Sequence, residues 1–152
     1  SVYGGATDLV LACDLRVGLS GTEFRMPAAA LGLHYYPSGL RRYVANFGVN
    51  GARRAFLTAR PMPAESLLAQ GVLLEVVAAE VFDATVAALV TDVARLAPLA
   101  AQATKQSLSD IANGRYDLNT LLTRQSMTLQ SEDFAEGRRA FAERRAPNFH
   151  GR

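Results

Sequence analysis

Apolar residues follow different patterns in the two halves of the chain. In the first half, short apolar runs are interrupted by glycine and proline, which is typical of short strands mixed with helices. The runs predict strands over residues 15–17, 23–26 and 72–77, and helices over 6–15, 40–47, 49–57 and 64–70. In the first of these helices, Leu9, Ala12 and Cys13 share one face, which we expect to be apolar and buried.

From residue 81 onward, apolar residues recur at helical spacing. This spacing predicts helices over residues 82–96, 98–112 and 118–130. A last helix starts after Ser131, whose hydroxyl is suited to an N-cap, and ends near Arg145. We therefore divide the chain into an α/β part, residues 1–80, and a helical part, residues 81–152.

The composition excludes several kinds of site but does not identify a reaction. The 152 residues, 49% of them hydrophobic, can bury the core of one domain, or of one domain with an appendage. Cys13 is the single cysteine and the two histidines, His34 and His150, lie far apart, so we expect no disulfide and no metal site. The net charge of +2 without interleaved aromatic and basic residues gives no reason to expect a nucleic-acid partner. No apolar run reaches the ~20 residues that span a bilayer, and the start lacks signal-peptide character, so we expect a cytoplasmic protein without a membrane partner.

The pair Gly4-Gly5 stands where the first predicted helix begins. The leading N–H groups of a helix have no internal partner and can stabilise an oxygen that gains negative charge. A plain turn is the alternative, and a glycine pair alone favours it. Asp8, about one turn further on, is suited equally to proton transfer near that point and to a favourable interaction with the helix dipole.

Two tyrosines, Tyr35 and Tyr36, lie in a loop rich in proline and glycine. A phenol in such a loop can orient a substrate or move a proton, although packing at the rim of a site is the commoner role. We expect His34 to form hydrogen bonds within the loop and Cys13 to be a small core residue.

Several of these segments occur in an order that resembles the crotonase, or enoyl-CoA hydratase/isomerase, superfamily. The resemblance covers essentially the whole chain and matches the C-terminal portion of that family. It is carried by these segments: 1–6 (SVYGGA), 12–16 (ACDLR), 24–27 (FRMP), 31–33 (LGL), 57–59 (LTA), 71–73 (GVL), 97–98 (AP) with Lys105, 131–134 (SEDF), 136–137 (EG), 140–141 (AF), 144–145 (RR) and 147–149 (PNF).

The resemblance implies an α/β fold, a crotonase-like spiral of β-β-α units followed by a helical trimerisation region. The implied partners are an acyl-CoA thioester and further copies of the chain, in a homotrimer or a dimer of trimers. Coenzyme A is part of the substrate, so no separate cofactor is implied. By position, Gly5 resembles the second oxyanion-hole donor, and Phe141 and Arg144 resemble residues that contact CoA bound to a neighbouring subunit.

Two departures from the family's hydratases bear on the reaction. Asp8 falls where hydratases carry their first catalytic Glu, and its carboxylate is set back by ~1.5 Å because Asp is one methylene shorter. Ala28 falls where they carry the second Glu and cannot transfer a proton.

The 32–36 stretch (GLHYY) instead resembles the methylmalonyl-CoA decarboxylase branch, with Tyr35 at that branch's catalytic Tyr. We therefore expect decarboxylation of a malonyl- or methylmalonyl-type thioester. A hydratase or isomerase with unusual acid/base residues and a non-catalytic acyl-CoA-binding subunit are the alternatives.

Overall fold

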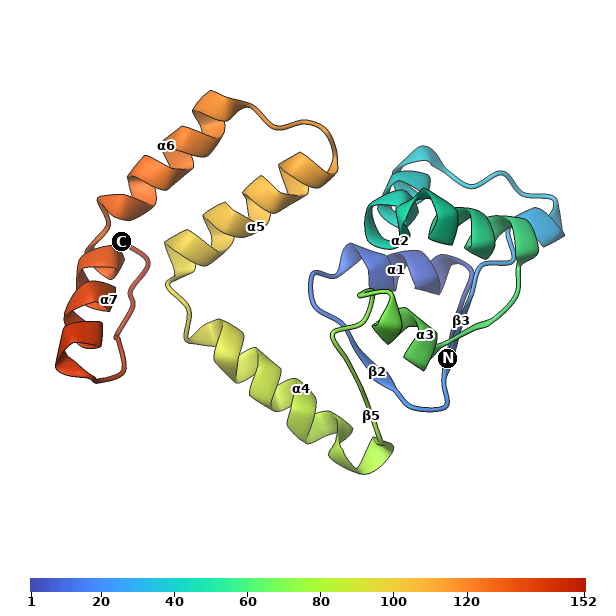
Figure 1. Ribbon diagram of the computed structural model, residues 1–152, viewed down its shortest axis with the longest axis horizontal. Coiled ribbons are helices and arrows are strands. Elements are labelled where there is room, and N and C mark those ends of the chain that lie inside the picture. Colours follow the sequence, from blue (N-terminus) through green and yellow to red (C-terminus); the bar gives the residue numbers. More distant parts are fainter. The chain divides into compact units, whose positions relative to one another are not determined.

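The computed structural model describes residues 1–152, which form two compact units, Ser1–Val86 and Ala87–Arg152. The first unit carries all the strands and the second is helical (Figure 1). The model thus has the mixed α/β composition that the sequence predicts.

Two small sheets form the framework of the first unit. Strand β3 (Glu23–Arg25) lies between β1 (Val2–Tyr3), which is parallel to it, and β4 (Met62–Pro63), which is antiparallel. Strand β2 (Val17–Leu19) pairs in parallel with β5 (Glu75–Val77). The predicted strand over 23–26 is found, whereas the one predicted over 15–17 lies two residues later, and β1 and β4 were not predicted.

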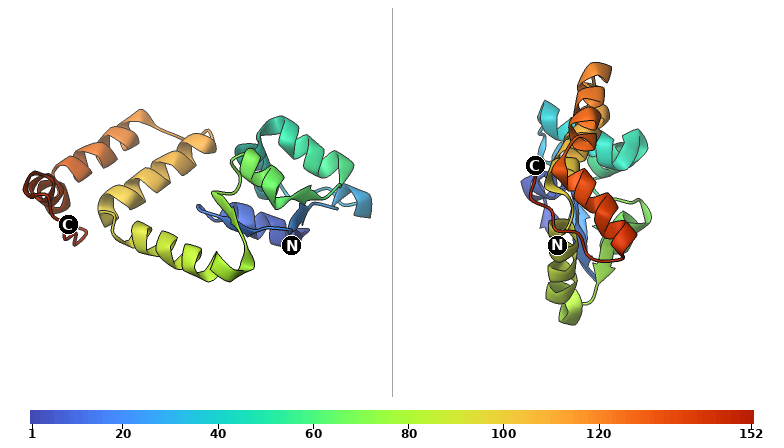
Figure 2. Two further views of the ribbon diagram at one scale, coloured as in Figure 1. Left: turned by 60° about the horizontal axis from the view of Figure 1, so that its bottom comes forward. Right: turned by 90° about the vertical axis from the view of Figure 1, so that its left-hand side faces the viewer.

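Helices α1 (Gly5–Ala12) and α2 (Pro37–Thr58) pack against each other (Figures 1 and 2). A short 3₁₀ turn, η1 (Ala29–Leu31), and helix α3 (Ala64–Ala69) complete the unit. Gly48 breaks α2 with a φ of 64° and a ψ of 170°, as expected from the two helices predicted on either side of it. The core of this unit is aromatic, because Phe24 and Tyr43 are almost fully buried and lie with ring centroids 6.0 Å apart.

The predicted buried face of the first helix is wrong. Cys13 and Leu9 are exposed, and α1 instead buries Thr7, Asp8 and Leu11. The helix has a low contrast between its apolar and polar sides because most of its residues are apolar. Polar contacts with α2 set the orientation of α1. The pattern of apolar residues in the sequence does not reveal such contacts.

Four helices make up the rest of the chain: α4 (Ala79–Ala94), α5 (Pro98–Ala112), α6 (Leu118–Leu129) and α7 (Glu132–Glu143). All four were predicted, and Ser131 caps α7 by accepting a hydrogen bond from the Phe134 N–H at 3.0 Å. The tail folds back on α7, where Asp133 accepts hydrogen bonds from the backbone of His150 and Gly151 at 2.7 and 2.9 Å.

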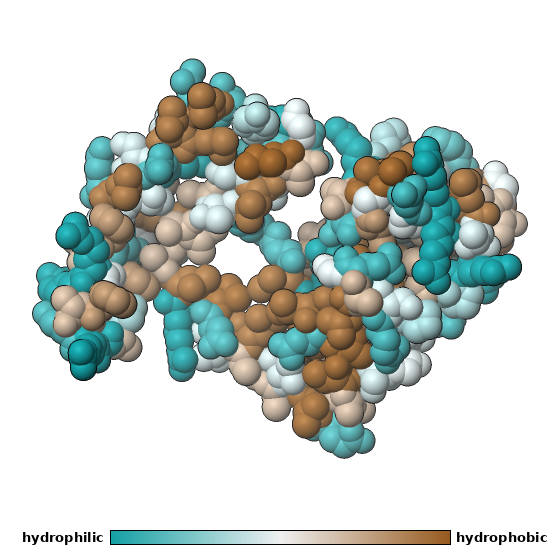
Figure 3. Space-filling view, viewed as in Figure 1, coloured by the Kyte–Doolittle hydropathy of each residue, from teal (hydrophilic) through white to brown (hydrophobic).

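Helices α4, α5 and α6 contain no buried residue. Large apolar side chains therefore lie at the surface of the helical unit, several of them on α5 and α6 (Figure 3). No single helix is long and apolar enough to cross a membrane, although α4 and α5 taken together meet the length and composition required.

Candidate active site

The start of α1 is fixed by the residue before it. Gly4 has a φ of 56° and a ψ of −124°, a combination that is essentially restricted to glycine. Its N–H donates to the Arg25 carbonyl of β3 at 3.0 Å, and its carbonyl accepts from the Thr7 N–H at 3.1 Å. The turn from β1 into α1 is therefore held at both ends.

Gly5 is the first residue of α1 and is exposed. A methyl group added to it would meet no atom within 4 Å, so there is open space beside this residue. The N–H groups of a first helical turn point away from the helix body and lack intrahelical partners. The role of Gly5 as an oxyanion-hole donor stays a prediction, made for a residue that the structure places at an exposed helix start.

Asp8 is a buried carboxylate held by a charged clamp. Its residue is 4% exposed, and Arg42 of α2 donates to it through Nε at 2.7 Å and through Nη2 at 2.5 Å. The Tyr36 hydroxyl donates to the same carboxylate. The hydrogen bonds from Arg42 hold the pKa of Asp8 below its ordinary value, so at neutral pH the group is an ionised acceptor.

The two tyrosines of the loop differ in exposure. Tyr35 is 6% exposed and packs in the aromatic core, with its ring 5.4 Å from that of Phe56. Tyr36 is 45% exposed and stacks on Tyr35 at 4.3 Å. The Tyr35 hydroxyl donates to the Tyr36 hydroxyl at 3.3 Å, so a line of hydrogen bonds leads from Tyr35 through Tyr36 to Asp8. Burial raises the pKa of Tyr35, which therefore stays protonated.

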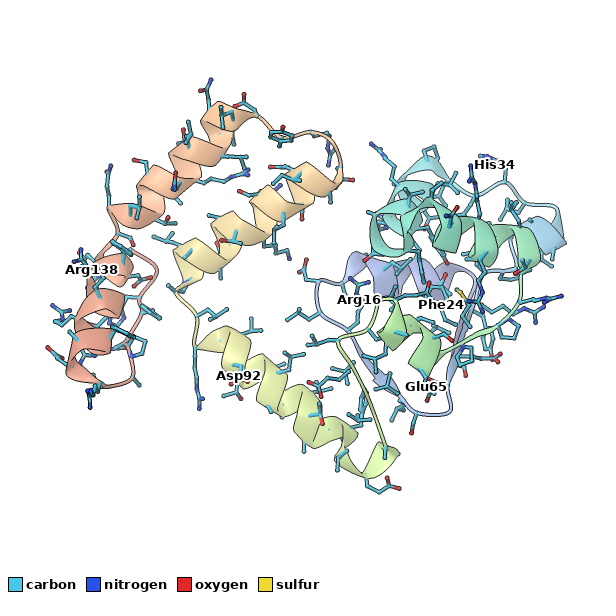
Figure 4. All side chains as sticks on the ribbon, in the orientation of Figure 1. Arg16, Phe24, His34, Glu65, Asp92 and Arg138 are labelled. Atoms are coloured by element: carbon cyan, nitrogen blue, oxygen red, sulfur yellow. The ribbon has the colours of Figure 1, made fainter.

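The structure brings Asp8, Tyr35 and Tyr36 together through hydrogen bonds, and Asp8 lies about one turn after Gly5 in α1. Ala28, where hydratases carry a second Glu, is buried at 4% exposure. His34 is exposed at the edge of the unit (Figure 4). No group of three His, Cys, Asp or Glu side chains is placed to hold a metal ion.

Phe141 and Arg144 lie in the second unit, on α7 and at its end. Phe141 is 87% exposed, and Arg144 has a φ of 54° in the left-handed region that closes the helix. Both side chains are accessible to a ligand. On the same helix, Glu136 accepts hydrogen bonds from Arg139 and Arg145, which hold its pKa well below the usual range.

Sequence reasoning missed Arg42 and assigned Tyr36 no role distinct from Tyr35. Arg42 is 34 residues from Asp8, and their contact depends on α2 lying across α1. One signal was available: residues 37–58 contain four arginines and no acidic residue, so a guanidinium there needs an acceptor from elsewhere.

Comparison with known proteins identifies the family. The model of the enoyl-CoA hydratase/isomerase family matches residues 1–152. Methylmalonyl-CoA decarboxylase of Escherichia coli K12 is 29% identical over 99% of this chain, and carnitinyl-CoA dehydratase of Salmonella typhi is 32% identical over 99%.

Among solved structures, an enoyl-CoA hydratase/carnithine racemase from Magnetospirillum magneticum gives a TM-score of 0.91 at 27% identity, covering 99% of this chain and 56% of that one. The chain spans 59% of the length of the decarboxylase and 60% of the dehydratase, in keeping with the predicted match to a C-terminal portion. The chain belongs to the enoyl-CoA hydratase/isomerase family, with the crotonase fold that its sequence predicts.

Proposed function

We propose that the protein is an enzyme that acts on an acyl-CoA thioester by stabilising its enolate, and that its reaction is the decarboxylation of a malonyl- or methylmalonyl-type thioester. The observation that carries the proposal is the exposed N-terminus of α1, where Gly5 is the first helical residue and the charge of the neighbouring Asp8 is paired with Arg42.

The proposed step moves an electron pair and needs no base. The bond between the α-carbon and the carboxylate breaks, and its electrons form the enolate, whose negative charge rests on the thioester oxygen. Carbon dioxide leaves, and the α-carbon then takes a proton that comes from water. The Gly5 N–H donates to the oxygen as its charge grows, which is the contribution expected of an oxyanion-hole donor.

The state of Asp8 favours this reaction over hydration. Addition of water to an enoyl thioester needs groups that release and accept protons. Asp8 is ionised and accepts hydrogen bonds from Arg42 and Tyr36, and the Ala28 side chain has no proton to exchange. A hydratase would have to move its protons through other groups.

The tyrosine pair is suited to hold the departing carboxylate. A neutral phenol can orient a carboxylate without the strong stabilisation that would oppose its loss. Tyr35, the residue predicted for this role, is protonated but mostly buried, and Tyr36 is the accessible member. We assign the contact to this stacked pair: one of the two hydroxyls, which otherwise donate to Tyr36 and to Asp8, would turn its proton to the substrate carboxylate, while stacking on Tyr35 holds the ring of Tyr36.

The helical unit supplies the rest of the proposal. Exposed Phe141 and Arg144 would contact the CoA moiety through an apolar surface and a cation, respectively. The uncovered apolar side chains of α4, α5 and α6 are suited to assembly, and we propose a homotrimer or a dimer of trimers.

The proposal is tested with the purified full-length protein. Release of CO₂ from malonyl-CoA and methylmalonyl-CoA is measured alongside hydration of crotonyl-CoA. We expect release of CO₂ and little hydration. Rapid hydration without CO₂ release would refute decarboxylation, and tight binding of CoA esters without turnover of any would identify a binding subunit.

A further inference from the structure

The peptide bond between Gly4 and Gly5 is held by a line of hydrogen bonds that starts in the core. The Thr7 hydroxyl lies 2.5 Å from the Gly4 carbonyl oxygen, in addition to the Thr7 N–H at 3.1 Å. The Tyr43 hydroxyl lies within hydrogen-bond distance of the Thr7 hydroxyl. Both Thr7 and Tyr43 are 0% exposed, so water does not compete for these bonds.

The donor in each of these hydrogen bonds follows from the last acceptor, the Gly4 carbonyl. A carbonyl oxygen only accepts, so the Thr7 hydroxyl donates its single proton to Gly4. The same hydroxyl must then accept from Tyr43. Burial raises the pKa of Tyr43, so its hydroxyl keeps the proton that it donates. The protons therefore run from Tyr43 to Thr7 to the Gly4 carbonyl.

The Gly4 carbonyl and the Gly5 N–H belong to one planar trans peptide and point in opposite directions. Two donors from buried Thr7 that hold the carbonyl thus fix the N–H on the opposite side of the peptide, at the exposed residue Gly5. Consecutive hydrogen bonds also polarise one another. When the Gly4 carbonyl accepts strong hydrogen bonds, the Gly5 N–H of the same peptide group becomes a better donor.

Resting on the proposed function, we propose that Thr7 and Tyr43 are positioning residues for the Gly5 oxyanion donor, acting through the Gly4–Gly5 peptide. Neither side chain touches substrate. Their effect is to hold the N–H in place and strengthen it before the reaction begins.

The test compares Thr7→Val and Tyr43→Phe with the conservative Thr7→Ser in the full-length protein. Thr22→Val is the matched control, because the Thr22 hydroxyl donates to the Leu19 carbonyl three residues earlier at 2.6 Å, away from α1. The probe is butyryl-CoA labelled with ¹³C at the thioester carbonyl, and the measurement is the infrared shift of that carbonyl on binding. Turnover is measured in parallel.

We expect binding to shift the carbonyl stretch to lower frequency in the wild type, in Thr7→Ser and in Thr22→Val. The shift should fall by half or more in Thr7→Val and by less in Tyr43→Phe, with kcat about tenfold to hundredfold lower in Thr7→Val and KM changed less than threefold. A merely structural role would lower thermal stability and leave the shift of the folded protein unchanged, which would overturn the proposal.

Two further outcomes are decisive. If Thr7→Val does not fold, Tyr43→Phe decides, and a wild-type carbonyl shift in that variant counts against the proposal. If the wild type polarises the carbonyl but releases no CO₂, decarboxylation fails while the positioning role stands. Absence of any carbonyl shift in the wild type would overturn the positioning role itself.

Discussion

Replacing Arg42 with Met tests the charged clamp that joins α1 to α2. The substitution keeps an unbranched apolar stem in place of the guanidinium and leaves Asp8 buried with only the Tyr36 hydroxyl as a side-chain donor. Removing one member of a buried ion pair costs about 3–5 kcal/mol. Because the Arg42 side chain is 34% exposed, solvent screens part of the interaction, and we expect a loss of about 2–3 kcal/mol in the free energy of unfolding.

The assay is urea unfolding followed by far-ultraviolet circular dichroism and by tyrosine fluorescence, since the chain has five tyrosines and no tryptophan. Asp8→Asn and the double variant Asp8→Asn/Arg42→Met complete a double-mutant cycle. In the double variant no charge is left unpaired, so we expect a coupling of about 1–2 kcal/mol between the two sites. Losses that add to within about 0.5 kcal/mol would show that Asp8 does not depend on Arg42.

The same cycle has a pH signature. The pKa of Asp8 is lowered on folding, so its contribution to stability is present above its unfolded pKa of about 3.9 and is lost as the pH falls through the lower folded value. The wild type should therefore lose stability below about pH 4 more steeply than Arg42→Met. Equal slopes in the two proteins would contradict the clamp.

Further predictions concern the turn before α1, the tyrosine pair and the C-terminal region. Gly4→Ala should cost about 1–3 kcal/mol in unfolding free energy, because alanine is strained at a φ of 56°, and an unchanged urea midpoint would refute this. Tyr36→Phe should raise the pKa of Asp8, measured by carboxyl ¹³C NMR, because one donor to the ionised form is lost. Glu136→Gln should speed cleavage of the C-terminal tail by a nonspecific protease, because Arg145 and the Asn148 N–H lose their charged acceptor; a tail cleaved at the wild-type rate would refute it. Phe141→Ala should change unfolding free energy by less than about 0.5 kcal/mol and yet raise KM for the thioester, and an unaltered KM would remove Phe141 from the proposed CoA surface.

Helices of the second unit could be predicted because their signals are local. Pro98 opens α5 and Ser131 caps α7, and the spacing of apolar residues between such markers needs no knowledge of the rest of the fold. Strands β1 and β4 have two residues each and exist only because β3 lies between them. Pairing of that kind depends on distant segments, so periodicity could not reveal it.

The residues of the candidate site likewise include some that the local sequence suggests and others that only tertiary contacts bring in. Gly5 and Asp8 could be proposed as site residues because both lie in one short segment with a recognisable order. The partner of Asp8 could not, since Arg42 reaches it only after α2 packs on α1. Cys13 shows the opposite error, because an apolar segment was assumed to bury its least polar face, whereas buried hydrogen bonds of Thr7 and Asp8 turn that segment the other way.

These contacts together constrain the chemistry of the site. At neutral pH Asp8 is an ionised carboxylate whose pKa Arg42 lowers further, and Tyr35 and Tyr43 are protonated phenols whose pKa values burial raises further. A site built in this way has few protons to exchange but several donors and charges that do not move. Reactions that shift electrons onto an oxygen benefit from such a preorganised environment, whereas reactions paced by proton transfer do not. Loss of CO₂ from a thioester belongs to the first kind and hydration to the second, and this difference supports the proposed decarboxylation without requiring a direct contact between Tyr35 and the substrate.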